Sequence, residues 1–309
     1  MNRRNFLNAA GLSLGFTAMP GLNDQLQGQT RLPEPEYRPR MKFGFVTYLW
    51  GKDMKLPDLI KACESSGLLG VETRTEHAHG VEPELTASQR DEVRKRFADS
   101  PVRLIGYGSN CQFHDAEPEK LQANILQAKK YIRLMHDCGG TGLKVKPNGF
   151  PKNVDRRRTI EQIGKALNEI ATYGDDYGQE IRVEVHGSGT SDLEVMKSIF
   201  DVADHPNARV CWNSNNQDLA GKGLEHNFGL VSKRFGATAH VRELDSKEYP
   251  YQQLFNHFAG MQYSGWVLLE ARTNPVDKVA AMKYQKGLFD KLYINALAAS
   301  GKASGAARL

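Results

Sequence analysis

Short apolar runs alternate with amphipathic stretches along the chain from residue 41 onward. The runs have the length of buried strands, whereas the stretches between them carry apolar residues at the three- and four-residue spacing of helices. The runs predict strands at residues 42–48, 70–74, 103–108, 142–147, 181–186, 208–213, 237–242 and 266–271. Helices are predicted at residues 56–66, 87–98, 119–138, 159–177 and 276–298, and the weakest helical pattern, at 223–235, follows the sixth strand.

The repetition of strand and helix predicts the fold class. Eight such repeats are typical of a closed (β/α)8 TIM barrel, an α/β fold with a parallel sheet, whereas an open doubly wound sheet usually has fewer strands. A barrel of this kind needs roughly 250 residues, so we expect a single barrel domain over residues 41–298 of the 309-residue chain. Residues 299–309, rich in Gly, Ala and Ser, are expected to form a flexible tail.

The residues before the first predicted strand resemble an export signal followed by a linker. Arg3 and Arg4 precede a mildly apolar stretch at residues 9–22, the arrangement of a twin-arginine signal, and a polar linker extends to residue 40. We therefore expect a periplasmic or exported protein; the alternative is a cytoplasmic N-terminus with two chance arginines. No segment has the roughly 18 consecutive apolar residues of a membrane span, so stable membrane insertion is not expected.

Charge and cysteine content narrow the range of functions. The formal charge is +5, of which Arg3 and Arg4 contribute two, so the remainder carries +3. The basic runs at residues 94–96 and 156–158 fall in polar helical segments, and we interpret them as solvated helix faces and expect no nucleic-acid partner. The cysteines, Cys63, Cys111, Cys138 and Cys211, lack the paired spacings of zinc and redox sites and are expected to be buried thiols. The sequence leaves oligomer formation open.

Ionisable and amide side chains occur at the C-terminal ends of most predicted strands, where buried parallel strands are normally apolar. They are Glu72, Arg74, Lys144, Lys146, Glu184, His186, Asn213, His240, Arg242 and Glu270. In a barrel this end carries the active site. Burying such groups alone would cost several kcal/mol each, so they must pair with one another, with a metal or with a substrate. For Glu72, Arg74 and Arg242, salt bridges at the barrel rim and substrate binding both stay open.

Four of these residues, from four successive predicted strands, form a candidate metal site. Glu184, Asn213, His240 and Glu270 offer three oxygen ligands and one imidazole. This mixed donor set suits one divalent ion, Mn²⁺, Mg²⁺, Co²⁺ or Zn²⁺, and leaves coordination positions for substrate oxygens.

Short motifs at these strand ends resemble those of the sugar phosphate isomerase/epimerase family, the xylose-isomerase-like TIM barrels. They are Gly70-Val71-Glu72, Val183-Glu184-Val185-His186, Cys211-Trp212-Asn213, Ala239-His240-Val241 and Leu268-Leu269-Glu270, in this order over residues 41–297. The resemblance implies that Glu184, Asn213, His240 and Glu270 hold one divalent metal ion, with Mn²⁺ as the first expectation. It also implies that the two glutamates flank a sugar carbon and move its proton.

The chain departs from the family pattern in two places. The ligand on the sixth strand is commonly Asp, whereas here it is Asn213, a neutral donor that weakens metal affinity. The family's substrate-binding His shortly after this ligand is replaced by Asn215 or Asn216, and its Arg after the seventh strand has no clear counterpart. The substrate therefore does not follow from the resemblance.

Other polar residues near the strand ends complete the expected site. His186 shares a strand face with Glu184, and Lys146 lies nearer the mouth than Lys144, so we expect His186 and Lys146 to act in catalysis beside Glu184 and Glu270. The residues expected to bind the substrate are Glu72, Lys144, His114, Asn216 and Arg242.

These residues lead to three functional hypotheses, each with a small carbohydrate as the partner. The first is a metal-dependent sugar isomerase or epimerase that removes a proton next to a carbonyl of a sugar or polyol, with carboxylates as base and acid. The second is a metal-dependent lyase or dehydratase that eliminates from a keto-sugar or keto-glycoside. The third is a non-catalytic exported carbohydrate-binding barrel, which Asn213 favours. The family also includes nucleases, which use additional histidines on early strands. This chain has Glu72 and Tyr107 there, so we do not expect nuclease activity.

Overall fold

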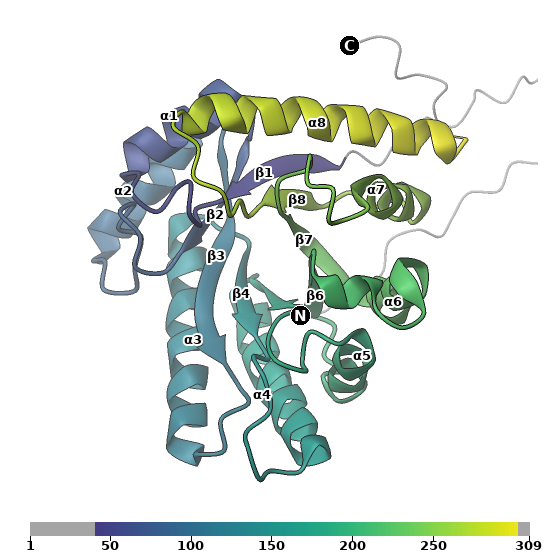
Figure 1. Ribbon diagram of the computed structural model, residues 1–309. Helices are drawn as coiled ribbons and strands as arrows, with labels where there is room; N and C mark the ends of the chain where they lie inside the picture. Colours follow the sequence, from purple (N-terminus) through teal and green to yellow (C-terminus); the bar gives the residue numbers. More distant parts are fainter. Residues whose placement is uncertain (1–40, 302–309) are drawn as a thin grey trace, which may run out of the picture. The chain divides into compact units, whose positions relative to one another are not determined.

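A computed structural model describes residues 41–301 of the chain, which form a closed barrel (Figure 1). The predicted export signal and linker, residues 1–40, lie outside the described residues, as do residues 302–309 of the predicted tail. The last helix of the described part ends at Ala299.

Within residues 41–301, eight parallel strands form a closed ring in chain order. They are β1 (Lys42–Val46), β2 (Gly70–Arg74), β3 (Arg103–Gln112), β4 (Gly142–Lys146), β5 (Glu180–Glu184), β6 (Ala208–Asn213), β7 (Phe235–Val241) and β8 (Trp266–Leu269). Phe45 on β1 lies opposite Leu269 on β8, which closes the sheet. The predicted fold class, a (β/α)8 TIM barrel, is confirmed.

Each strand is followed by a helix, and the first seven helices return the chain toward the start of the next strand. The helices of the described residues are α1 (Leu56–Ser66), α2 (Ala87–Ala98), α3 (Pro118–Cys138), α4 (Arg156–Asp176), α5 (Leu193–Val202), α6 (Gly223–Val231), α7 (Tyr251–Gly260) and α8 (Lys278–Ala299), with 3₁₀ helices η1 (Asn216–Leu219) and η2 (Ser232–Arg234) around α6. Figure 1 shows α8, in yellow, beside α1 and α7. The weak sixth helical pattern is a short α-helix continued by a 3₁₀ turn.

Helix ends agree with the sequence where local signals are strong. Helices α1 and α2 have the predicted bounds. A capping box formed by Thr86 and Gln89 starts α2, so the first backbone N–H groups find partners in side chains. Gly67 ends α1 with a φ of 76°, a left-handed conformation that glycine adopts without strain.

Strand ends depend more on neighbouring strands than on the local sequence. Strand β3 continues beyond the predicted end at residue 108, because Gln112 still pairs with Lys146 of β4. Strand β8 is shorter than predicted and stops at Leu269, so that Glu270 follows it directly. The backbone N–H of Glu270 nevertheless bonds the carbonyl of Val241 at 2.7 Å, which keeps this residue at the barrel rim.

The N-terminal half of the barrel interior holds the buried side chain of Arg182 from β5. Its Nε donates to Glu180 and its NH1 donates to the carbonyl of Ile105, both at 2.8 Å, so the buried charge is satisfied. Gly142 on β4 provides the space, because a Cβ there would lie 2.6 Å from Cζ of Arg182. This half of the barrel is therefore tightly filled, and the candidate site lies at the opposite end.

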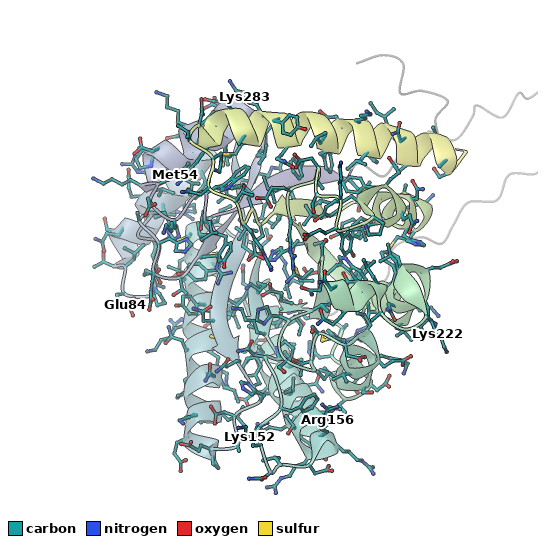
Figure 2. All side chains as sticks on the ribbon, in the orientation of Figure 1. Met54, Glu84, Lys152, Arg156, Lys222 and Lys283 are labelled. Carbon is teal, nitrogen blue, oxygen red and sulfur yellow. The ribbon has the colours of Figure 1, made fainter. Side chains whose placement is uncertain are left out.

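Side chains fill the ring of strands and the layer between strands and helices (Figure 2). Phe45, Trp212 and Phe255 are fully buried, whereas Lys222 beside α6 and Lys283 on α8, both labelled in Figure 2, lie at the periphery. Among residues 41–301, no helix combines the length and apolar character needed to cross a membrane. Because buried apolar side chains pack throughout this barrel, polar groups inside it need hydrogen-bond or ion-pair partners.

The packing around Arg182 makes a prediction about stability. Gly142→Ala is expected to lower the free energy of unfolding by about 2–4 kcal/mol, because the new methyl group would collide with Arg182 and with the carbonyl oxygen of Glu180. Gly287→Ala is the control: Gly287 lies within α8 with nothing within 4 Å of an added Cβ. This substitution is expected to stabilise by about 0.5–1 kcal/mol. Urea unfolding measures both, and equal stabilities would contradict the packing described here.

Candidate functional site

Three side chains of metal-ligand type meet at the C-terminal ends of β5, β7 and β8. Glu184 is the last residue of β5, His240 lies one residue before the end of β7, and Glu270 follows β8 directly. One ligand atom from each residue lies within 4.8 Å of the other two, and all three residues are buried. The structure thus brings together three of the four residues that the sequence predicts as metal ligands. We call the three side chains of Glu184, His240 and Glu270 the metal cluster; the name refers to these possible ligands and not to bound ions.

Two buried donors hold Glu184. Lys144 of β4 donates from Nζ to Oε2 of Glu184 at 2.7 Å, and Asn213 of β6 donates from Nδ2 to Oε1 at 3.0 Å. Burial disfavours the charged carboxylate, but Lys144 and then His240 hold the pKa of Glu184 well below its ordinary value. Glu184 is therefore ionised at neutral pH.

Asn213, the predicted fourth ligand, lies next to the metal cluster with its NH₂ group directed at Glu184. It is 2% exposed and lies opposite His240 in the pairing of β6 with β7. Its oxygen would face an ion only if the side-chain amide were turned over, which would break the hydrogen bond to Glu184. In the present orientation, Asn213 supports the charge of Glu184.

His240 lies between two carboxylates. Its Nε2 is 3.2 Å from Oε1 of Glu72 on β2, and its Nδ1 is 3.7 Å from Oε1 of Glu184. Burial opposes a charge on the ring, but Cys211, Glu72 and Glu184 together raise the pKa of His240 well above its ordinary value. Burial also opposes ionisation of Glu72, yet His240 and then Lys144 lower the pKa of Glu72 below its ordinary value. Without an ion, this buried pair therefore carries opposite charges.

Glu270 is paired with Arg74 at the end of β2. The guanidinium NH1 lies 2.9 Å from Oε1 of Glu270, and NH2 lies 3.4 Å from Oδ1 of Asn110. The guanidinium also lies over the ring of Tyr48, 5.1 Å from its centroid, which is within the range of a cation–π interaction. Arg74 therefore forms the rim salt bridge that the sequence left as one of two possibilities.

The charges around the metal cluster balance when no ion is bound. The carboxylates of Glu72, Glu184 and Glu270 are matched by Lys144, Arg74 and the protonated ring of His240. With a divalent ion bound and the ring neutral, the same groups would carry one net positive charge. A positive charge at this position would favour an anionic form of a bound substrate over the neutral form.

Lys146, the last residue of β4, has no acidic partner within residues 41–301. Its Nζ donates to Oδ1 of Asn110 at 3.2 Å. Burial, followed by the charge of Lys144, lowers the pKa of Lys146 to about 8. An amine with this pKa is able to give or take a proton near neutral pH.

His186 and His114 contact the turn that follows β4. Nδ1 of His186 lies 2.8 Å from Oδ1 of Asn148. The ring of His114 faces Gly149, where a Cβ would lie 3.8 Å from Cδ2 of the ring. Both rings are half-buried, and burial lowers the pKa of each below its ordinary value. Both histidines are therefore neutral at pH 7 and border the mouth beside β4 and β5.

Two residues predicted to bind the substrate have no direct link to the metal cluster. Asn216 begins η1 and is exposed. Arg242 follows β7 and, with Arg272 and Tyr284, lines a cavity of about 630 Å³ between the loops after β7 and β8. Among the described residues, no hydrogen bond or ion pair joins either residue to the metal cluster.

Three further residues belong to the site although the sequence does not indicate them. Asn110 bridges two cations of the mouth, Asn148 holds a histidine, and Tyr48 lies against a guanidinium. Asn110 escapes notice because β3 extends beyond its predicted end. Asn148 follows a proline, which is a weak turn signal, and the structure gives it a φ of 68°, a conformation that Asn tolerates better than most residues. The partner of Tyr48 comes from a different strand, so no local signal indicates it.

The residues present fit a divalent metal ion. Two carboxylates and an imidazole converge, and within the described residues neither ring nitrogen of His240 makes a hydrogen bond, although the ring is fully buried. Buried polar atoms without partners are uncommon in proteins, and an ion beside Nδ1 would provide one. Oxygen donors with one imidazole suit Mn²⁺, Mg²⁺, Co²⁺ and Zn²⁺ and do not select among them.

Comparison with known proteins identifies the family. Residues 60–288 match the model of the xylose isomerase-like TIM barrel family, and the chain belongs to this family. The membership suggested by the strand-end motifs is thereby confirmed. No curated protein matches the chain in sequence.

Solved structures with the same fold include several sugar epimerases. An L-ribulose 3-epimerase superposes with a TM-score of 0.74 at 12% identity, over 87% of this chain and 100% of that one. The 3-keto-D-glucoside 4-epimerase YcjR from E. coli gives a TM-score of 0.69 at 12% identity, over 82% and 100%. The IOLI protein with a bound zinc atom gives 0.68 at 15% identity, over 82% and 98%. At these identities the likeness is one of fold.

The contact between Asn213 and Glu184 predicts the effect of restoring a carboxylate on β6. Asn213→Asp is expected to destabilise the metal-free protein by about 2–4 kcal/mol, because two buried carboxylates would then repel each other. The same change is expected to tighten Mn²⁺ binding about tenfold or more, since it adds an anionic ligand. Thermal unfolding in chelator and calorimetric titration with Mn²⁺ measure the two effects.

Asn216→Asp is the matched control for this prediction, because it adds the same charge at an exposed position of η1. Its stability is expected to stay within about 0.5 kcal/mol of the parent protein. If Asn213→Asp changes neither stability nor affinity more than this control, Asn213 does not reach the metal cluster.

Proposed function

We propose that the protein is a metal-dependent sugar epimerase or isomerase that removes a proton from a carbon next to a carbonyl group. The observation that carries the proposal is the convergence of two carboxylates, Glu184 and Glu270, with His240 at the barrel mouth. Membership of the family and the sugar epimerases among the structural neighbours support it. Glu184, His240 and Glu270 would hold the ion, which when bound would polarise the carbonyl and the adjacent hydroxyl of a sugar.

The two carboxylates differ in how freely they accept a proton. Both oxygens of Glu184 accept hydrogen bonds, from Lys144 and Asn213, which stabilise its charge. Glu270 uses Oε1 for Arg74, and no hydrogen bond or ion pair of the described residues involves its Oε2. We therefore assign Glu270 as the base that first removes the proton. Glu184 is the second proton-transfer group.

Lys146 is assigned to the oxygen that gains negative charge when the carbon loses its proton. With a pKa of about 8, Lys146 is mostly protonated at neutral pH and donates hydrogen bonds. Its contact with Asn110 holds the ammonium at the mouth without neutralising it. Such a donor stabilises the enediolate more than the neutral ketone, which is the requirement for catalysis. Proton return to the opposite face gives an epimer, and return to the neighbouring carbon gives an isomer.

Solvent deuterium exchange tests the proposed reaction. The purified protein with Mn²⁺, Mg²⁺, Co²⁺ or Zn²⁺ is incubated in deuterated water with free ketoses and 3-keto-glycosides, and proton NMR follows the carbon next to the carbonyl. We expect loss of that proton signal and formation of an epimer or isomer. Glu270→Gln is expected to reduce exchange by a factor of about 10² or more while the protein still folds.

The same assay separates the other two functional hypotheses. An unsaturated product with loss of a hydroxyl or glycosidic group would favour the lyase or dehydratase. Saturable sugar binding without exchange would favour the carbohydrate-binding barrel. Absence of exchange with every metal and sugar would contradict the proposed epimerase. Export by a twin-arginine route stays a prediction from residues 1–40.

The lowered pKa of Lys146 predicts a pH dependence. If Lys146 must be protonated, kcat/KM falls as the pH rises through about 8, where the amine loses its proton. Lys146→Arg keeps its charge at high pH, so this alkaline limb should disappear, whereas Lys146→Met should lose about 10²-fold in kcat/KM. Lys152→Met, at an exposed loop position labelled in Figure 2, is the control and should keep the parent profile. An unchanged limb in Lys146→Arg would exclude this role.

A further inference from the structure

We propose that Glu72 is a positioning residue, which orients the imidazole of His240 so that Nδ1 faces the metal cluster. The inference rests on the metal-dependent function proposed above. It replaces the substrate contact expected for Glu72 from the sequence with a role beneath the cluster, at the far side of the histidine ring.

The geometry gives the two ring nitrogens of His240 different neighbours. Nε2 lies 3.2 Å from Oε1 of Glu72, which is an ion-pair distance, although the contact does not meet the angular limits of an ordinary hydrogen bond. Nδ1 lies on the other side of the ring, 3.7 Å from Oε1 of Glu184, which belongs to the metal cluster. When the ring is neutral, as a metal ligand must be, the nearby carboxylate of Glu72 favours the proton on Nε2 and leaves the lone pair of Nδ1 directed at the cluster.

Within residues 41–301, Glu72 has no other hydrogen-bond or ion-pair partner that would explain its position. It is fully buried, and among the described residues neither of its oxygens accepts a hydrogen bond that meets ordinary geometric limits. The histidine ring is its closest ion-pair contact. A buried carboxylate with so few partners costs several kcal/mol. Among the described residues, the histidine ring is the one ion-pair partner of Glu72, so it is the group on which Glu72 acts.

The barrel directs Glu72 toward His240 across its interior. Strands β2 and β7 are not neighbours in the ring, so the contact spans the inside of the barrel. The pairing of β2 with β3 shifts register between Val71 and Glu72, and such irregularities re-aim side chains. Gly108 of β3 leaves room for the carboxylate, because a Cβ there would lie 2.8 Å from Oε1 of Glu72. Three strands therefore cooperate in placing one carboxylate.

The physical consequence is a preorganised ligand. A histidine that binds a metal through one nitrogen usually donates its other N–H to a carboxylate or carbonyl group, which fixes the ring orientation and makes the ligand nitrogen more basic. Loss of such a partner typically weakens metal affinity by about 10- to 100-fold. Glu72 is the residue that provides this support for His240.

Calorimetric titration of Mn²⁺ into metal-free full-length protein tests the inference at a fixed pH. Glu72→Gln keeps the shape of the side chain but removes its charge, and we expect the Kd for Mn²⁺ to rise about 10- to 100-fold. Glu82→Gln is the matched control, because Glu82 lies in the loop after β2 and accepts a hydrogen bond from Tyr107, which is not part of the metal cluster. Its Kd should stay within about twofold of the parent value.

A second measurement needs no bound metal. In the parent protein, the Nε2–H proton of His240 should give a downfield, slowly exchanging NMR signal because the ring is fully buried with a carboxylate 3.2 Å from Nε2; His240→Gln assigns the signal by its loss. The signal should move upfield in Glu72→Gln and stay in Glu82→Gln.

The outcomes separate the inference from the proposed function. If the parent protein binds Mn²⁺ and Glu72→Gln binds it equally well, the role of Glu72 is overturned while the metal site stands. If the parent protein binds no divalent metal, the proposed function fails, and the NMR signal alone decides whether Glu72 orients the ring. A parent protein without a protected Nε2–H signal would overturn the inference directly.

Discussion

Carboxylates buried inside a barrel must be neutralised, and this constraint shapes the mouth of the protein. Glu72, Glu184 and Glu270 are each buried and each lies within 3.2 Å of a cationic group. The partners come from β2, β4 and β7, so the charges are balanced only because the ring of strands is closed. Removal of one partner would leave an uncompensated charge in the apolar interior, and this destabilises a protein by more than the intact pair stabilises it. The site and the closed barrel therefore depend on each other.

The mouth has two halves with different chemistry. Strands β5, β7 and β8 provide the metal cluster, whereas the ends of β2 and β4 provide Arg74 and Lys146, which share Asn110. A sugar placed between the halves would present a carbon to the carboxylates and an oxygen to the ammonium. This separation of base and oxyanion donor is what removal of a proton next to a carbonyl requires. In the proposed reaction, these cations would stabilise an anionic intermediate although Asn213 itself is neutral.

The barrel fold and most of the polar residues at its mouth were predictable from the sequence, because apolar residues recur with the periods of strands and helices. The spacing of apolar residues within each short segment indicates whether it is a strand or a helix, and a polar side chain at the end of a strand interrupts that spacing. The family motifs then identified Glu184, His240 and Glu270, which the structure brings within 4.8 Å of one another. Asn110 was not recognised, because the end of β3 is set by pairing with β4 rather than by its own composition.

The sequence by itself determined the pattern of eight strands and their helices, the family, and the candidate polar side chains at the strand ends, since each of these depends on residues close together in the chain. Only the tertiary structure decided which groups pair: Glu72 with His240 across the barrel, Lys144 with Glu184, and Arg74 with Glu270. These partners are separated by many residues, and their distances follow from strand register and barrel closure. Interactions between charges are large in a low-dielectric interior and depend on their separation, so the three-dimensional arrangement, and not the composition, sets the charge of each group.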